Sequence, residues 1–163
     1  MIDLGAFLRV PYVETEMGFD LSPDGKRVAF SWTPNGRWEI YEISLEGEGA
    51  PRQISRGSGG KFHPRYSSDG KCLAFTVDYD GSENFHIHVH DLISGRQNDL
   101  TPDVHSALQS FFAWSPDSTQ IAYLSDHSGQ FNAYVLTLGD GIKRVYESEK
   151  PSLKKLRRVV LES

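Results

Sequence analysis

The chain has 163 residues and a net charge of −5 at neutral pH. Hydrophobic residues make up 38% of it and aromatic residues 12%, which excludes an intrinsically disordered chain and is typical of one folded domain. No apolar run is long enough to span a membrane, and the acidic balance argues against a nucleic-acid partner. We therefore expect a folded protein that binds neither nucleic acid nor a membrane.

The two ends of the chain differ from its middle. Residues 1–16 lack the basic start and long apolar centre of a signal peptide, so we predict a cytoplasmic protein that begins with a short arm. The single cysteine, Cys72, cannot form an internal disulfide, which fits a reducing compartment. The basic tail, residues 147–163, has apolar residues at helical spacing and is predicted to be a short helix or the start of a further element.

One turn motif occurs three times. Ser-Pro-Asp-Gly at residues 22–25 returns as Ser-Ser-Asp-Gly at residues 67–70 and as Ser-Pro-Asp-Ser at residues 115–118, at offsets of 45 and 48 residues. Aspartate bonds back to nearby amides in such a turn, and glycine accepts a positive backbone angle. Because serine replaces glycine at Ser118, we expect the third turn to differ in type.

Short runs rich in β-branched and aromatic residues surround each turn. The run after the turn is long enough for a strand and too short for a helix, at residues 28–32, 73–77 and 121–124. A glycine-bearing loop, a strand headed by an aromatic residue and a weaker closing strand follow in every copy. Four strands in about 45 residues are the pattern of a β-propeller blade.

We therefore predict an all-β fold of about three four-stranded antiparallel propeller blades. The blades are expected at residues 17–56, 62–101 and 110–146. A β-sandwich also has short strands separated by turns, but it does not explain why the strand chemistry recurs in register. Since a closed ring needs about four to eight blades, three blades make an incomplete propeller.

The repeated segments LSPDGKRVAF, YSSDGKCLAF and AWSPDSTQIAY resemble the propeller of the prolyl oligopeptidase family of serine peptidases, especially its acylaminoacyl-peptidase-like members, and the related TolB-like propellers. The resemblance covers roughly residues 10–146. It implies that the chain is the non-catalytic propeller portion of such a peptidase, which gates the access of peptides to a separate hydrolase domain. No serine here lies in the Gly-x-Ser-x-Gly elbow of that domain. We predict no catalytic residue, no cofactor and no enzymatic activity in this chain alone.

The partners follow from the open ends of three blades, which would expose apolar faces and strand edges to solvent. We expect them to be covered by a hydrolase domain of a longer parent chain or by further copies of the chain, and peptides are possible ligands. The alternative function is a stand-alone propeller-type protein-interaction module that is completed by self-association. A homo-oligomer is predicted in that case.

Two stretches contain residue types that bind metals. The sequence HIHVH places three histidines on one face of a strand, where alternate residues lie about 6 to 7 Å apart and only neighbours could share an ion. The sequence DYDGSEN resembles a calcium loop but lacks the full length of one, so an ordinary turn or a cation site are both open. We predict no metal site, and the residues that would form one are His86, His88, Asp78 and Asp80.

Two other features have structural and functional alternatives. Trp32, Trp38 and Trp114 are expected to pack between blades, the alternative being stacking against a ligand. The glycine-rich segment at residues 56–61 is expected to be a flexible connector between the first two blades.

Overall fold

The computed structural model of the chain describes residues 18–102, 108–126, 129–139 and 141–146. The predicted arm at residues 1–16 and the predicted tail at residues 147–163 lie outside these ranges. Every element in the described ranges is a β-strand. No helix capable of crossing a membrane occurs among them.

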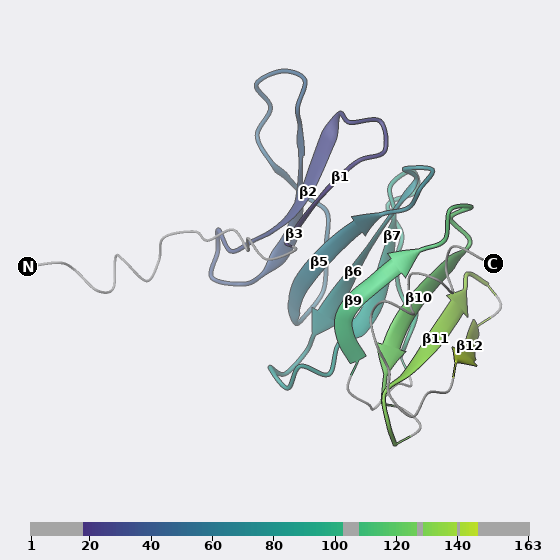
Figure 1. Cartoon of the computed structure of the whole chain (residues 1–163). Helices are drawn as coiled ribbons and strands as arrows, with labels where there is room; N and C mark the ends of the chain where they lie inside the picture. The colour runs from purple at the N-terminus through teal and green to yellow at the C-terminus, as the bar shows by residue number, and fades with distance from the viewer. Residues whose placement is uncertain (1–17, 103–107, 127–128, 140, 147–163) are drawn as a thin grey trace, which may run out of the picture.

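The strands form three antiparallel sheets of four, which we call blades 1, 2 and 3 (Figure 1). Blade 1 contains β1 (Phe19–Leu21), β2 (Arg27–Trp32), β3 (Glu39–Ser44) and β4 (Arg52–Gln53); blade 2 contains β5 (Gly60–Tyr66), β6 (Cys72–Asp78), β7 (His86–Asp91) and β8 (Gln97–Asp99); blade 3 contains β9 (Leu108–Trp114), β10 (Gln120–Ser125), β11 (Asn132–Thr137) and β12 (Gly141–Tyr146). Strands that are consecutive in the chain are neighbours in each sheet, so every blade is a meander. The predicted all-β fold of three four-stranded antiparallel blades is confirmed.

Two of the three closing strands lie slightly earlier than the sequence pattern suggested. The pattern placed them around Ile54, Leu100 and Val145; β12 contains Val145, but β4 ends at Gln53 and β8 ends at Asp99. The amides of Ile54 and Leu100 still donate to the carbonyls of the preceding long strand, each over 2.8 Å. The apolar side chains that marked these strands therefore begin the links that lead to the next blade.

Blades 1 and 2 pack face to face through a buried apolar layer. Blade 1 contributes Ala29 and Ile40, and blade 2 contributes Leu73, Phe75 and Val77, all fully shielded from solvent. Side chains alternate between the two faces of a strand, so these residues come from every second position. A small residue opposite large ones lets the two sheets approach closely.

The same arrangement recurs between blades 2 and 3. Ala74 and Ile87 on the far face of blade 2 pack with Ile121, Tyr123 and Leu136 of blade 3. The position of Ala29 in blade 1 is thus that of Ala74 in blade 2. Each blade presents a face with a small residue to the blade that follows it and a face of large residues to the blade that precedes it.

The three Ser-x-Asp turns are built by one set of hydrogen bonds. In blade 1 the amide of Arg27 donates to Ser22 Oγ over 2.9 Å, the Ser22 hydroxyl donates to Asp24, and the amide of Lys26 donates to Asp24 Oδ1 over 3.1 Å. The second and third turns repeat all three bonds. The hydrogen bond from the serine hydroxyl is the main reason why the pKa of the second turn's Asp69 falls to about 2.

The third turn is of the same type as the others, so the expectation of a different type was wrong. Ser118 has a φ of 64°, close to the 71° of Gly25 and the 69° of Gly70. Its hydroxyl oxygen accepts a hydrogen bond of 3.0 Å from the amide of Asp69 in the neighbouring turn. This contact between blades 2 and 3 offsets the cost of a left-handed backbone at a residue with a side chain.

We expect Ser118→Ala to destabilise the protein by about 1 kcal/mol, because it removes the hydrogen bond and keeps the strained backbone. Ser118→Gly should leave stability nearly unchanged, since relief of about 1 kcal/mol of strain offsets the lost bond. Urea unfolding of the two variants and the parent chain measures both effects. A glycine variant less stable than the alanine variant would show that the backbone at this position is not strained.

Candidate binding surface at the link edge

Each blade has two edges at which its strands turn. Because the strands are antiparallel, the Ser-x-Asp turns and the β3–β4 and β7–β8 loops lie at one edge, which we call the turn edge. The β2–β3 and β6–β7 loops and the links between blades lie at the opposite one, the link edge. A row of aromatic side chains and a buried ion pair lie at or near the link edge.

A row of aromatic rings crosses all three blades near the link edge. Ring centroids lie 5.6 Å apart between Trp38 and Phe62, 6.3 Å between Phe62 and Phe85, 6.3 Å between Phe85 and His63, and 6.0 Å between His63 and Phe111. Trp38 belongs to blade 1 and Phe111 to blade 3. Four of the rings are partly buried and Phe111 is 37% exposed. We call these five residues the aromatic row.

His63 joins the row because its backbone is bent. The pairing of β5 with β6 shifts register between Phe62 and Arg65, and His63 there has a φ of 54°. A bulge of this kind redirects a side chain, here towards blade 3. Burial, aided by the charge of Arg65, lowers the pKa of His63 to about 4, so its ring is neutral at pH 7.

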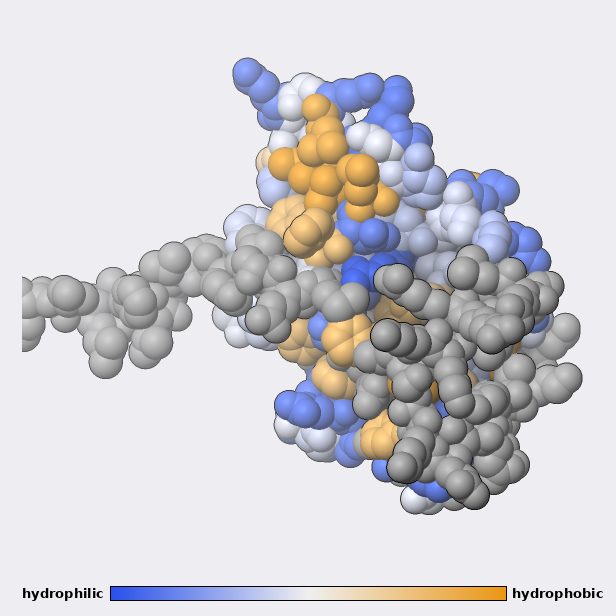
Figure 2. Space-filling model, in the orientation of Figure 1, coloured by the Kyte–Doolittle hydropathy of each residue, from blue (hydrophilic) through white to orange (hydrophobic). Residues whose placement is uncertain are grey.

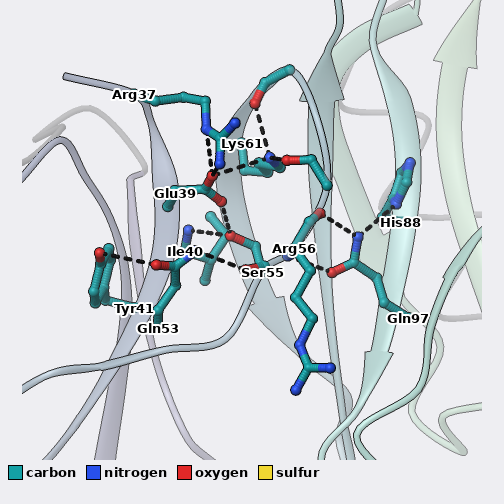
Figure 3. Close-up of polar contacts among 12 residues, drawn as sticks. Arg37, Glu39, Ile40, Tyr41, Gln53, Ser55, Arg56, Lys61, His88 and Gln97 are labelled. Carbon is teal, nitrogen blue, oxygen red and sulfur yellow. Dashed lines mark hydrogen bonds and ion pairs between the residues drawn. The ribbon is translucent and has the colours of Figure 1, made fainter. Parts of the chain in front are cut away.

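Lys61, which precedes Phe62 of the row, forms a buried ion pair with Glu39, which follows Trp38 (Figure 3). The side chain of Lys61 is fully buried, and its Nζ lies 3.3 Å from Glu39 Oε1. It also donates to the carbonyls of Gly57 and Gly59 over 2.6 Å and 2.9 Å. Glu39 accepts further hydrogen bonds from Ser55 and from the exposed Arg37. Burial lowers the pKa of the Lys61 amino group and Glu39 opposes that shift.

The glycine-rich segment before Lys61 is held in place rather than free, so the expectation of a flexible connector was wrong. Two of its carbonyls bind the Lys61 amino group, and the amide of Lys61 donates to the carbonyl of Trp38 over 3.0 Å. A side chain at Gly60 would come within 2.9 Å of the Phe62 ring. Glycine at this position therefore makes room for the aromatic row.

The HIHVH strand does place its three histidines on one face, opposite Val77, Phe75 and Leu73 of β6. Asp99 Oδ2 lies 3.0 Å from His86 Nδ1 and 3.6 Å from His88 Nε2. Burial alone would raise the pKa of Asp99, but its contacts with His88 and its neighbours hold it below the ordinary value. Within the described part of the chain, no group of three or more metal-binding side chains is arranged to hold an ion.

The other metal candidates, Asp78 and Asp80, form an ordinary turn. Asp78 Oδ1 accepts hydrogen bonds from the amides of Asp80 and Gly81, over 3.3 Å and 2.8 Å. Asp80 Oδ1 accepts one from the amide of Ser82 over 3.1 Å. The loop amides thus already bind the carboxylate oxygens that a cation would need.

Two of the three tryptophans that were predicted to pack between blades do so, and the cysteine is partly buried. Trp38 packs against the blade 2 ring of Phe62, and Trp114 Nε1 donates to the blade 2 carbonyl of Arg65 over 3.1 Å. Trp32 instead lies on the face of blade 1 that points away from blade 2. Cys72 is partly buried, and burial raises the pKa of its thiol.

Sequence reasoning missed the Lys61–Glu39 pair and the role of His63. A lysine that follows two glycines gives no sign that it is buried, because its partners come from another blade. The Pro64 that follows His63 was a partial signal, since proline inside a strand occurs on an edge strand or at a bulge, and both are found here.

Three meanders of four strands, each packed face to face on the next, are three blades of a β-propeller. Comparison with known proteins identifies the family of β-propellers to which the chain belongs. The TolB beta propeller domain family matches residues 14–153, and the chain belongs to this family.

The relatives are longer than this chain. It is 31% identical over 132 residues to the protein TolB homolog of Chlorobium luteolum, covering 76% of this chain and 27% of that protein. The structure of a putative TolB from Agrobacterium tumefaciens has a TM-score of 0.67 and 25% identity, with 80% of this chain and 46% of that one covered. The chain thus spans about a quarter of the length of its curated relative.

A peptidase propeller has the same fold. The β-propeller domain of the Trilobed protease from Pyrococcus furiosus aligns with a TM-score of 0.63 and 21% identity, covering 88% of this chain and 44% of that one. The resemblance to both TolB-like and peptidase propellers is therefore confirmed at the level of the fold. The family is that of TolB.

We expect Lys61→Met to destabilise the protein by about 3 kcal/mol, because it removes the buried cation beside Glu39 and leaves that carboxylate with Ser55 and the exposed Arg37 alone. The control is Lys26→Met, which removes an ion pair to Glu46 that is more than half exposed and should cost under about 1 kcal/mol. Urea unfolding measures both. Equal losses in the two variants would mean that the Lys61 contacts add nothing beyond a surface pair.

His63 should make stability depend on pH in the mildly acidic range. Its pKa is lowered by folding, so its contribution is complete above about pH 6.5 and is lost as the pH falls towards 4. In His63→Asn the free energy of unfolding should fall less steeply between pH 7 and 4.5, by up to about 1.4 kcal/mol per pH unit. Urea unfolding at several pH values tests this, and parallel curves for the two proteins would contradict a buried neutral ring.

Proposed function

We propose that this chain is a non-catalytic part of a larger TolB-type propeller and that its link edge binds extended peptide segments. The observation on which this rests is the aromatic row. Its centroids are 5.6 to 6.3 Å apart, close to the spacing of about 6 to 7 Å between alternate side chains of an extended peptide. Rings of this kind bind apolar side chains by burial and by stacking.

The need for further blades follows from the outer face of blade 1. Phe19 and Leu21 on this face are 57% and 52% exposed, whereas Tyr66, at the site of Leu21, is buried against blade 1 together with Leu73 and Phe75 on the same face of blade 2. Figure 2 shows apolar side chains gathered over β1 and β2 on this surface. A surface that is covered in blades 2 and 3 and open in blade 1 is suited to one more blade.

Two sources of that blade support different forms of the proposal. A longer chain could supply this blade, and the greater length of the TolB relative favours this source. If that chain also had a hydrolase domain, the link edge would gate the access of peptides to it, which is the role that the peptidase resemblance implies. A second copy of this chain is the other source and would give a stand-alone interaction module. The mass of the particle in solution distinguishes a second copy from a longer chain as the source of the blade. The cytoplasmic location stays a prediction.

The binding role is tested with two peptides of one composition. Ser-Phe-Ser-Leu-Ser-Phe-Ser has apolar side chains at alternate positions, and Ser-Ser-Phe-Phe-Leu-Ser-Ser does not. We expect the full chain to bind the first more tightly in isothermal titration calorimetry. Phe111→Ser should weaken that binding about tenfold, because about 1.4 kcal/mol of ring contact is lost.

The matched control is Ile93→Ser. Ile93 is 78% exposed on the β7–β8 loop at the turn edge, so the affinity should not change. Equal affinity for the two peptides, or an equal loss in the two variants, would contradict binding by the aromatic row. Cleavage of either peptide, detected by mass spectrometry, would contradict the non-catalytic part of the proposal.

A further inference from the structure

Blade 2 holds the link that leaves blade 1 through a side-chain amide. The amide nitrogen of Arg56 donates to Gln97 Oε1 over 2.9 Å, and Gln97 Nε2 donates to the carbonyl of Arg56 over 3.0 Å (Figure 3). We call this pair of bonds the link clamp. One main-chain donor and one main-chain acceptor bind the two ends of the amide, so only one orientation of Gln97 satisfies both.

That orientation determines the protonation state of His88. The second N–H of Gln97 Nε2 points to His88 Nδ1 at 3.2 Å, so Nδ1 must accept a hydrogen bond and cannot hold a proton. The proton of the neutral ring is therefore on Nε2, which lies 3.0 Å from Tyr79 Oη. His88 is buried, and its ring stacks on Phe75 at a centroid distance of 5.9 Å.

We propose that protonation of His88 breaks the link clamp. A second proton on His88 would place an N–H of Nδ1 against the NH₂ group of Gln97. Rotating the amide of Gln97 by half a turn would present its oxygen to His88, but it would then set oxygen against the Arg56 carbonyl and NH₂ against the Arg56 amide. The charged form of His88 and the intact clamp therefore exclude each other.

His86 and His88 share one carboxylate. Asp99 contacts both His86 and His88, at 3.0 Å and 3.6 Å, and Tyr79 lies between their rings as a neutral group. One carboxylate compensates one imidazolium and not two. His86 faces no donor of the kind that Gln97 presents to His88, so a charge on His86 would be compensated by Asp99 without breaking the link clamp.

The next histidine along the strand, His90, takes no part in this effect. His90 is buried, and its Nδ1 has no hydrogen-bond partner in the described part of the chain. Burial lowers the pKa of His90, and so do the charges of Arg56 and Arg52, whereas Asp91 and Glu42 act in the opposite direction. These surroundings favour the neutral form of His90.

The sign of the effect follows from the geometry. The clamp forms only with neutral His88, so it is present while the ring is neutral and is lost when acid adds a proton to His88 Nδ1. Its loss frees Arg56, which precedes the carbonyl of Gly57 that binds Lys61. Acid therefore loosens the joint between blades 1 and 2. Blades 1 and 3 have Tyr41 and Tyr134 in this slot, so neither has an imidazole there.

Nuclear magnetic resonance of the full chain labelled with ¹⁵N tests the proposal in two ways. At pH 7.5 the imidazole spectrum of His88 should show the form protonated on Nε2 alone. Hydrogen exchange, corrected for the intrinsic effect of pH, should show protection of the Arg56 amide falling about tenfold or more between pH 7.5 and 5. In His88→Phe, which keeps a ring on Phe75, the protection of this amide should not depend on pH.

The amide of Ile54 serves as the internal control, because it donates to Ile40 within blade 1 and should keep its protection in both proteins. A proton on His88 Nδ1 at pH 7.5 would overturn the proposal without reference to any variant. So would a fall in protection at Arg56 that Ile54 shares, or that persists in His88→Phe.

Discussion

The structure depends on the burial of both faces of each four-stranded sheet. A single blade could cover neither face, because its long strands alternate apolar residues on two sides. The solution is a pairing of unlike faces: Ala29 and Ala74 belong to one kind of face, and Phe75 and Tyr123 to the other. Such a contact runs head to tail, so it can be continued but is not completed by three blades. The apolar outer face of blade 1 is the direct consequence.

Polar contacts position the blades that the apolar faces bring together. An apolar layer tolerates sliding, whereas a buried charge does not, because displacement would leave it without a partner. The Lys61–Glu39 pair and the Gln97–Arg56 clamp both act on the link between blades 1 and 2, and the Ser118 hydroxyl joins the turns of blades 2 and 3. The Lys61–Glu39 pair lies next to the aromatic row at the link edge, and the Ser118 contact lies at the turn edge.

The repeat makes local departures informative. Three blades with one architecture show which positions the fold requires, and residues that differ at such positions are available for other roles. His63 leaves the regular strand path and brings blades 2 and 3 into one aromatic row. His88 occupies a slot that holds tyrosine in the other two blades, and it introduces a titratable group into a joint between sheets. Both departures lie in blade 2, which is covered on both faces.

The sequence by itself determined the blades. Strand periodicity and turn chemistry are local properties, so the repeat of Ser22, Ser67 and Ser115 predicted three antiparallel meanders and placed HIHVH on one face. It could not show that Lys61 is buried, that Ser118 adopts a positive φ, or that His63 faces Phe111. Each of these depends on atoms about 20 to 50 residues away, and only the packing of one blade on another decides which side chains meet. Local chemistry therefore gave the units, and the contacts between units decided the site.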